Sequence, residues 1–154
     1  MRKNGLVFLF TVLIFCPFKN WSQEIRGLSF VGTRDQVNQE HLIPIKEGAA
    51  NWVALMPYGY MQSAQTPVVS YNTSWQWQGE TKNGIEQAVP FFERAGISVM
   101  LKPHIWIKGG VFTGIISFNS PEEWKQFQES YRQFILHFAQ LAEETKIPML
   151  CIGT

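Results

Sequence analysis

The amino-acid sequence predicts an α/β fold in which the strands of a parallel sheet alternate with helices. Two observations predict it. Four short segments are continuously apolar rather than alternating, which is typical of parallel strands covered on both faces. They are residues 27–31, 52–56, 97–101 and 149–152. Helical patterns lie between these segments, and such alternation indicates right-handed βαβ units and therefore a parallel sheet.

The composition fits one globular domain. The chain has 154 residues, of which 45% are hydrophobic and 16% charged, enough apolar material for a core and too little charge for a disordered chain. Arg2, Lys3 and Lys19 lie near the N-terminus, so 10 of the 13 basic residues remain against 12 acidic ones. Because phosphate-backbone binding depends on clustered cations, and the chain has no run of Lys or Arg, no nucleic-acid partner is expected.

Residues 1–22 have the layout of a secretory signal peptide, which leaves residues 23–154 as the single domain. Two basic residues precede an apolar run over residues 6–15, after which the segment turns polar. The run is about half of the roughly 20 residues that a spanning helix needs, so no stable membrane span is expected. We expect a secreted or periplasmic protein, with a lipoprotein modified at Cys16 as the minor alternative. Cys151 is then the remaining thiol and is expected to be inert.

The first two helical patterns are the less regular ones. One helix is expected between residues 35 and 48, and a second over residues 84–95. For the second helix, Asn83 is the expected N-cap and Gly96 the expected stop. Pro90 lies inside this pattern and removes a backbone donor, so a kink or a late start is expected.

The third helix, over residues 121–145, is the best defined. Ser120 as N-cap and Glu123 three residues later form a capping box. Apolar side chains recur at three- and four-residue steps, so this stripe must pack on another element. Trp124, at the first turn of this helix, is expected in the core, and His137, near the apolar stripe, is expected to be a packing residue.

The connections that leave the strands are long, whereas those that enter them are short. Residues 57–82 and 103–119 are predicted to be loops at the carboxyl ends of the strands, where parallel α/β folds and especially (β/α)₈ barrels build their sites. Both are rich in aromatic and amide side chains. Such a lining suits a saccharide, which has C–H faces and a hydroxyl rim, although aromatic loops also serve as lids packed on their own core.

The last predicted strand is of a buried type, and it ends the sequence. A sheet of four parallel strands would leave an apolar edge on each side. We therefore expect the first half of a (β/α)₈ TIM barrel, with about four parallel strands and intervening helices. A compact four-stranded α/β domain is the alternative. A half barrel alone is expected to be marginally stable and poorly soluble.

Four pieces of the sequence, in chain order, resemble glycoside hydrolase family 113. Its third-strand region is similar to residues 99–106 (VMLKPHIW) with 109–114 (GGVFTG) after them. Its second strand is similar to residues 48–59 (GAANWVALMPYG), and its third helix and fourth strand are similar to residues 124–143 and 152–154. The resemblance covers about residue 26 to the end. It implies a clan A (β/α)₈ barrel, typically of an endo-acting β-1,4-mannanase that retains anomeric configuration.

The resemblance also implies where the chemistry resides. Two glutamates act in that clan, an acid/base after the fourth strand and a nucleophile after the seventh. In the family the acid/base follows a Gly-Thr like Gly153-Thr154, so both glutamates are expected beyond residue 154. Glu80 is interpreted as a loop residue with no partner, and the remaining acids considered belong to the long helix: Glu122, Glu123, Glu129, Glu143 and Glu144. We assign no catalytic residue within the chain and expect no metal and no cofactor.

Half of a saccharide-binding cleft is expected at the strand ends. Lys102 and His104 stand at the mouth of the third strand, able to donate hydrogen bonds to sugar hydroxyls or to hold the catalytic carboxylates. Trp106 is a candidate stacking platform, and Tyr58, after the second strand, is another. The alternatives are a solvated Lys102, a structural His104 and a Trp106 packed in the core.

These observations support one leading hypothesis and two others. The leading one is the exported N-terminal half of a retaining glycoside hydrolase that acts on a β-linked polysaccharide, mannan first, and is inactive alone. The second is a non-catalytic saccharide-binding or assembly protein whose barrel is completed by a partner chain. The third is a metal-dependent hydrolase with His104 as a ligand, which lacks a second metal-binding side chain at a strand end.

Overall fold

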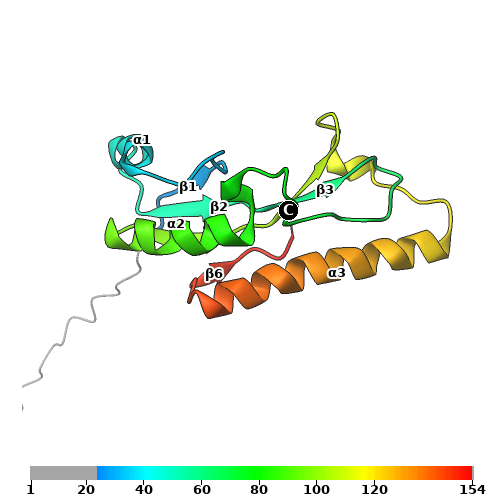
Figure 1. Ribbon diagram of the computed structural model, residues 1–154. Helices are drawn as coiled ribbons and strands as arrows, with labels where there is room; N and C mark the ends of the chain where they lie inside the picture. Colours follow the sequence, from blue (N-terminus) through cyan, green and yellow to red (C-terminus); the bar gives the residue numbers. More distant parts are fainter. Residues whose placement is uncertain (1–23, 154) are drawn as a thin grey trace, which may run out of the picture.

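The computed structural model describes residues 24–153 and contains a four-stranded parallel sheet flanked by helices (Figure 1). The strand order is β1-β2-β4-β6. The strands are β1 (Gly27–Phe30), β2 (Trp52–Leu55), β4 (Ser98–Leu101) and β6 (Met149–Leu150). Each lies within one of the predicted apolar segments, and every pair is parallel, which confirms the predicted α/β fold. The predicted signal peptide and Cys16 lie outside the described residues.

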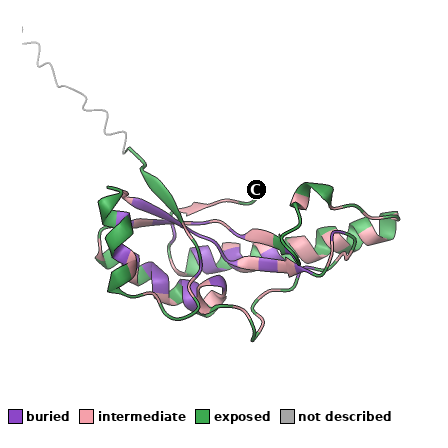
Figure 2. Ribbon diagram, turned by 90° about the horizontal axis from the view of Figure 1, so that it is seen from above, coloured by how far each residue is buried: buried purple, intermediate pink, exposed green. Residues whose placement is uncertain are grey.

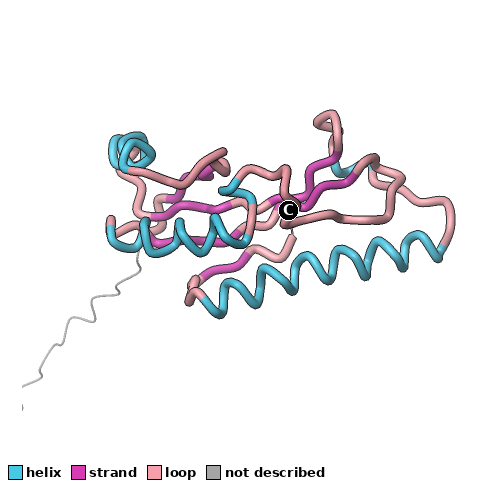
Figure 3. The backbone as a smooth tube through the Cα atoms, in the orientation of Figure 1, coloured by secondary structure: helices cyan, strands magenta, loops and turns pink. Residues whose placement is uncertain are grey.

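A second, two-stranded parallel sheet, which was not predicted, follows the first (Figure 3). Its strands are β3 (Tyr58–Met61) and β5 (His104–Ile107). The prediction that residues 57–82 and 103–119 are loops throughout is therefore wrong at the start of both segments.

The two prolines explain both the error and the architecture. Pro57 and Pro103 have no amide hydrogen and cannot donate within a sheet, and the two predicted loops begin at them. Hydrogen bonding nevertheless continues past them: the Lys102 amide donates to the Leu55 carbonyl at 2.8 Å, and the His104 amide donates to the Pro57 carbonyl at 2.9 Å. The strands β3 and β5 thus prolong β2 and β4 beyond the end of the four-stranded sheet.

Helix α1 (Leu42–Glu47) and helix α2 (Lys82–Arg94) occupy the first two predicted helical regions. Short 3₁₀ turns precede both, η1 (Gln39–His41) and η2 (Gln78–Glu80). Thr81, not Asn83, is the N-cap of α2, because its hydroxyl accepts the Gly84 amide at 3.3 Å. Gly96, with φ of +75°, follows the end of α2 as predicted.

Pro90 does not delay or interrupt α2. The helix starts earlier than predicted and is continuous across the proline, so the late start is wrong. A proline costs one backbone hydrogen bond, but the residues around it are held by burial. Ile85, Val89 and Phe92 on the same helix are among the most buried side chains of the described residues.

Helix α3 (Pro121–Glu144) starts with the predicted capping box, which is confirmed: the Ser120 hydroxyl accepts the Glu123 amide at 3.2 Å. The prediction for Trp124 is wrong. Its side chain is 41% exposed, because the first turns of α3 extend past the sheet, and its ring packs edge-on against Phe118 and Phe127 at the surface. His137 is half-buried and packs against Phe138 with a ring distance of 5.0 Å, so the prediction of a packing role is confirmed.

The core lies between the sheets and the inner faces of α2 and α3 (Figure 2). Phe134 and Phe138 of α3 are fully buried. The middle of α3 packs under β3, where Gly59 permits close approach: a Cβ there would lie 3.1 Å from the Phe134 ring. Among residues 24–153, no helix is both long enough and apolar enough to cross a membrane.

Candidate functional site

The second sheet brings together three of the four predicted site residues. In its register, Tyr58 pairs with His104 and Tyr60 pairs with Trp106. The Tyr58 ring lies 6.0 Å from the rings of both His104 and Trp106, in edge-on orientations. Trp75, from the loop that follows β3, packs edge-on against Tyr60 at 4.6 Å. We call these five side chains the aromatic cluster.

His104 presents an unsatisfied nitrogen. Its Nε2 atom is buried and has no hydrogen-bond partner among the described residues. Burial, and secondarily the charge of Lys102, lowers the pKa of His104 below its usual value, so the imidazole is neutral at pH 7. A buried polar atom without a partner is uncommon in proteins.

His104 also lies on the wall of an open pocket of about 550 Å³. The pocket is lined mainly by apolar and aromatic side chains from β5, the turn after it and α3. They include Ile105, Phe112, Phe127 and Tyr131. With His104, Thr113 and Tyr131 as its polar side chains, this concave and mainly apolar surface has the general form of a small-molecule site.

Trp106 is a surface residue of the cluster and is not packed in the core. Its side chain is 46% exposed, and that of Trp75 is 59% exposed. Tyr58 is half-buried beside them. Exposed aromatic faces next to hydrogen-bonding groups suit the C–H faces of a sugar ring. The binding roles of Tyr58, His104 and Trp106 stay predictions.

Lys102 occupies the junction between β4 and β5. Its amide takes part in the sheet, and its half-buried side chain is close enough for its charge to affect His104. The predicted role of Lys102 as a donor to sugar hydroxyls or carboxylates also stays a prediction.

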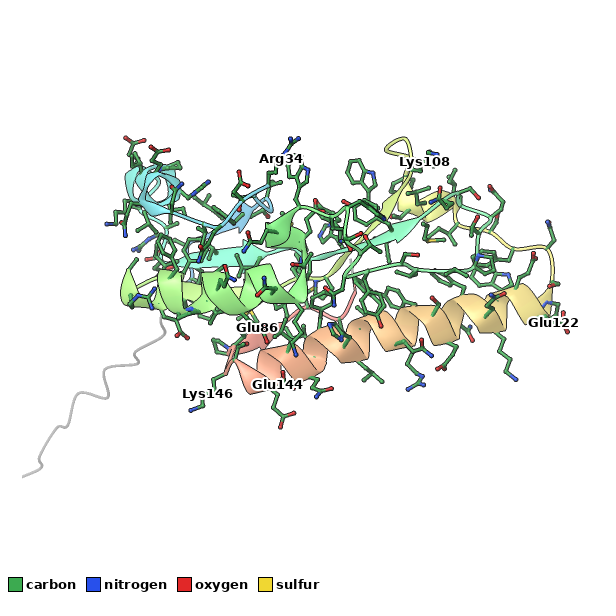
Figure 4. The ribbon with its side chains drawn as sticks, in the orientation of Figure 1. Arg34, Glu86, Lys108, Glu122, Glu144 and Lys146 are labelled. Carbon is green, nitrogen blue, oxygen red and sulfur yellow. The ribbon has the colours of Figure 1, made fainter. Side chains whose placement is uncertain are left out.

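Two further cations lie on one side of the molecule. Arg34 and Lys108 lie on the side of the molecule opposite α3 (Figure 4). The Arg34 guanidinium lies over the Trp77 ring, 5.4 Å from its centroid. The turn after β1 therefore contacts the loop that carries Trp75.

Glu80 differs most from its sequence-based prediction. It is only 7% exposed, and its carboxylate accepts a hydrogen bond from the Tyr60 hydroxyl at 2.9 Å, so the interpretation as a loop residue without a partner is wrong. Burial and this carboxylate raise the pKa of Tyr60 above its ordinary value, which keeps the phenol protonated. Burial, then the Glu80 charge, also raises the pKa of Tyr58. The sequence offered no sign of this contact, because Tyr60 and Glu80 meet only through the loop between them.

The described residues contain no pair of carboxylates at this site. Glu80 is the one buried acidic residue among the described residues, and the acidic residues of α3 lie on the surface of that helix. No three His, Cys, Asp or Glu side chains in residues 24–153 converge into a metal-binding group.

Solved structures resemble this fold. A structure of a GH113 β-1,4-mannanase superposes with a TM-score of 0.70 at 23% sequence identity, covering 84% of this chain and 45% of that one. A GH113 β-mannanase from Alicyclobacillus acidocaldarius in complex with ManMIm gives a TM-score of 0.68 at 26% identity, covering 84% and 44%. A further complex structure of a GH113 β-1,4-mannanase gives 0.68 at 21% identity. The chain thus spans a little under half the length of these proteins, and its sheets and helices match the first half of their TIM barrel.

The family comparison agrees with the structural one. No curated protein sequence matches this chain significantly. The sequence model of Glycoside Hydrolase Family 113, however, matches residues 30–154, which is most of the chain and includes the whole aromatic cluster. This chain belongs to glycoside hydrolase family 113.

Proposed function

We propose that this chain forms the first half of the barrel of an exported, retaining glycoside hydrolase that acts on a β-linked polysaccharide of the β-1,4-mannan type. The observation that carries the proposal is the family match over residues 30–154. A 26% identical member with the same fold is described as a β-mannanase. Export rests on the pattern of residues 1–22.

The aromatic cluster supplies the binding surface in this proposal. Trp106 and Trp75 offer exposed faces for sugar rings, and His104 lines the open pocket of about 550 Å³. Stacking and hydrogen bonding together orient a saccharide, because the ring faces are apolar and the rim is polar.

The bond-breaking groups come from outside the described residues. Retaining hydrolysis needs two carboxyl groups about 5–5.5 Å apart, one to protonate the leaving oxygen and one to attack the anomeric carbon. Glu80 has no second carboxylate beside it in residues 24–153 and is already bonded to Tyr60. We therefore expect the 154-residue polypeptide alone to cleave nothing.

The test compares the protein encoded by the complete reading frame with the 154-residue polypeptide. The first should release reducing ends from β-1,4-mannan, with β-1,4-glucan as the control substrate, and NMR of the first product should show a retained anomeric configuration. Inversion, or cleavage of the glucan but not the mannan, would refute the proposal. Turnover by the 154-residue polypeptide would refute its inactivity.

The second candidate is a saccharide-binding or assembly protein completed by a partner chain. One observation favours it: the described residues combine an aromatic binding surface with no carboxylate pair. Calorimetric titration with mannohexaose separates the two candidates. Binding without any cleavage by the complete gene product supports the binding protein, and cleavage excludes it.

A further inference from the structure

Burial of the Glu80 carboxylate costs desolvation free energy, and no cation among the described residues pairs with it to offset that cost. Glu80 is the one ionisable side chain among residues 24–153 that is buried, and none of the ion pairs in that range includes it. A buried carboxylate without a cation opposes folding. Its position therefore calls for a role other than stabilising the fold.

The backbone around Glu80 is built to hold it in place. The Gly79 amide donates to the Thr33 carbonyl at 2.9 Å, and the Gln78 amide donates to the Arg34 carbonyl at 3.1 Å. A Cβ at Gly79 would lie 2.5 Å from the Thr33 nitrogen, so only glycine allows this approach. The turn after β1 thus clamps the segment that delivers the carboxylate.

The carboxylate has one hydrogen-bond partner among residues 24–153, the Tyr60 hydroxyl. Tyr60 cannot rotate away without leaving Glu80 unpaired in a buried place, which is costly. The Tyr60 ring in turn supports Trp75, whose ring lies edge-on at 4.6 Å and is otherwise largely exposed. Gln76 anchors the backbone next to Trp75 by donating to the Tyr58 carbonyl at 3.0 Å, and the indole itself contacts the Tyr60 ring.

We infer that Glu80 is a positioning residue for saccharide binding: through the Tyr60 hydroxyl it holds Trp75 as a preformed platform for a sugar ring. The inference rests on the proposed function for the identity of the ligand. An ordered platform binds more tightly because less side-chain freedom is lost on binding. Glu80 itself does not contact the sugar.

The experiment uses the protein encoded by the complete reading frame and four variants. Glu80→Leu removes the acceptor, Tyr60→Phe removes the donor, and Glu80→Gln keeps an amide oxygen that accepts from Tyr60. Glu93→Gln on the exposed face of α2 is the matched control. The readouts are the affinity for mannohexaose, KM and kcat on mannan, and the ¹⁹F NMR signal of 5-fluorotryptophan at position 75, assigned with Trp75→Phe.

Glu80→Leu and Tyr60→Phe should each weaken mannohexaose binding about tenfold, raise KM with little change in kcat, and move or broaden the Trp75 signal. Glu80→Gln and Glu93→Gln should resemble the parent protein. Loss of binding in Glu80→Gln with an unmoved Trp75 signal would overturn the inference, because it would make the carboxylate a direct ligand. Parent-like behaviour of Tyr60→Phe would also overturn it, and this variant keeps the inference testable if Glu80→Leu fails to fold.

The ¹⁹F signal separates this inference from the proposed function, because it needs no sugar. If the parent protein neither binds nor cleaves mannan but the Trp75 signal responds to Tyr60→Phe and not to Glu80→Gln, the positioning role stands and the ligand is wrong. If mannan is cleaved normally and the signal responds to neither removal, the function stands and the positioning role is wrong.

Discussion

Lowering the pH should loosen the loop after β3 from α3, because one histidine joins them. The Asn72 Nδ2 group lies 2.7 Å from His137 Nε2, and the Asn72 Oδ1 atom accepts the Lys82 amide at 2.8 Å. Since Oδ1 is occupied, Asn72 presents its NH₂ group to the histidine. His137 must therefore accept at Nε2, which only the neutral imidazole can do.

The electrostatic surroundings agree with this assignment. Burial, and secondarily the charge of Lys82, lowers the pKa of His137 below 6.5, while Glu144 and Glu86 oppose the shift. Lys82 lies 3.1 Å from Glu144 and 3.6 Å from Glu86. Both glutamates lie where α2 and α3 approach each other (Figure 4). Protonation would place two donors face to face and break the bridge.

The sign follows from proton linkage. The unfolded chain binds a proton near pH 6.5 and the folded protein only at lower pH, so the free energy of unfolding falls as the pH drops below 6.5 towards the folded pKa and levels off beneath it. Loss of one neutral, partly exposed hydrogen bond is worth about 0.5–1.5 kcal/mol. We therefore expect the free energy of unfolding to fall by about this amount between about pH 7.5 and about pH 5.

The assay is urea unfolding of the complete gene product against its His137→Phe variant across that pH range. The phenyl ring keeps the packing on Tyr71 and Phe138 but cannot titrate. His104, whose pKa is also lowered, is present in both proteins and cancels in the difference. Parallel stability profiles for the two proteins, or a His137 pKa of 6.5 or higher by NMR, would refute the reasoning.

Three further predictions concern packing, capping and binding. Phe134→Ala should lower the free energy of unfolding by about 3–5 kcal/mol in urea titration, because the ring is fully buried; a loss below about 1 kcal/mol would contradict its place in the core. Ser120→Ala should cost about 1 kcal/mol by removing the acceptor of the Glu123 amide, and Ser120→Asp should restore it; equal stability of all three proteins would exclude the cap. Trp106→Ala should weaken mannohexaose binding about five- to tenfold in calorimetry, with thermal unfolding nearly unchanged since the ring is 46% exposed, and unaltered affinity would remove Trp106 from the binding surface.

Local patterns were sufficient for the elements that local physics controls. The four apolar segments became β1, β2, β4 and β6, and the Ser120 capping box started α3 where predicted. A hydrophobic period or a cap is satisfied within a few residues of sequence. The same local rules failed at Pro57 and Pro103, because the partner strand that carries the hydrogen bonds past each proline is distant in the chain.

The candidate site was likewise only partly predictable from the sequence. Tyr58, His104 and Trp106 could be selected from the sequence because each follows a predicted strand, and strand ends meet at one edge of a parallel sheet. Their pairing across β3 and β5 could not be predicted, since the sheet itself was missed. Trp124 was predicted in the core because its position fits the apolar stripe of the helix. The first turns of α3 extend past the sheet, however, so the side chain is exposed there.

What the sequence determined by itself is therefore the order of the four strands of the first sheet and the three helices, the cap of α3, the fold class and the family resemblance, all of which depend on neighbours along the chain. Only the tertiary structure decided that Glu80 is buried under Tyr60, that Trp75 rests on that tyrosine, and that His104 has an unpaired nitrogen. Burial and hydrogen-bond satisfaction depend on which distant segments meet. In the sequence, Glu80 cannot be distinguished from an exposed polar residue. Only in the folded structure is its carboxylate removed from water, with one hydroxyl as its partner among the described residues.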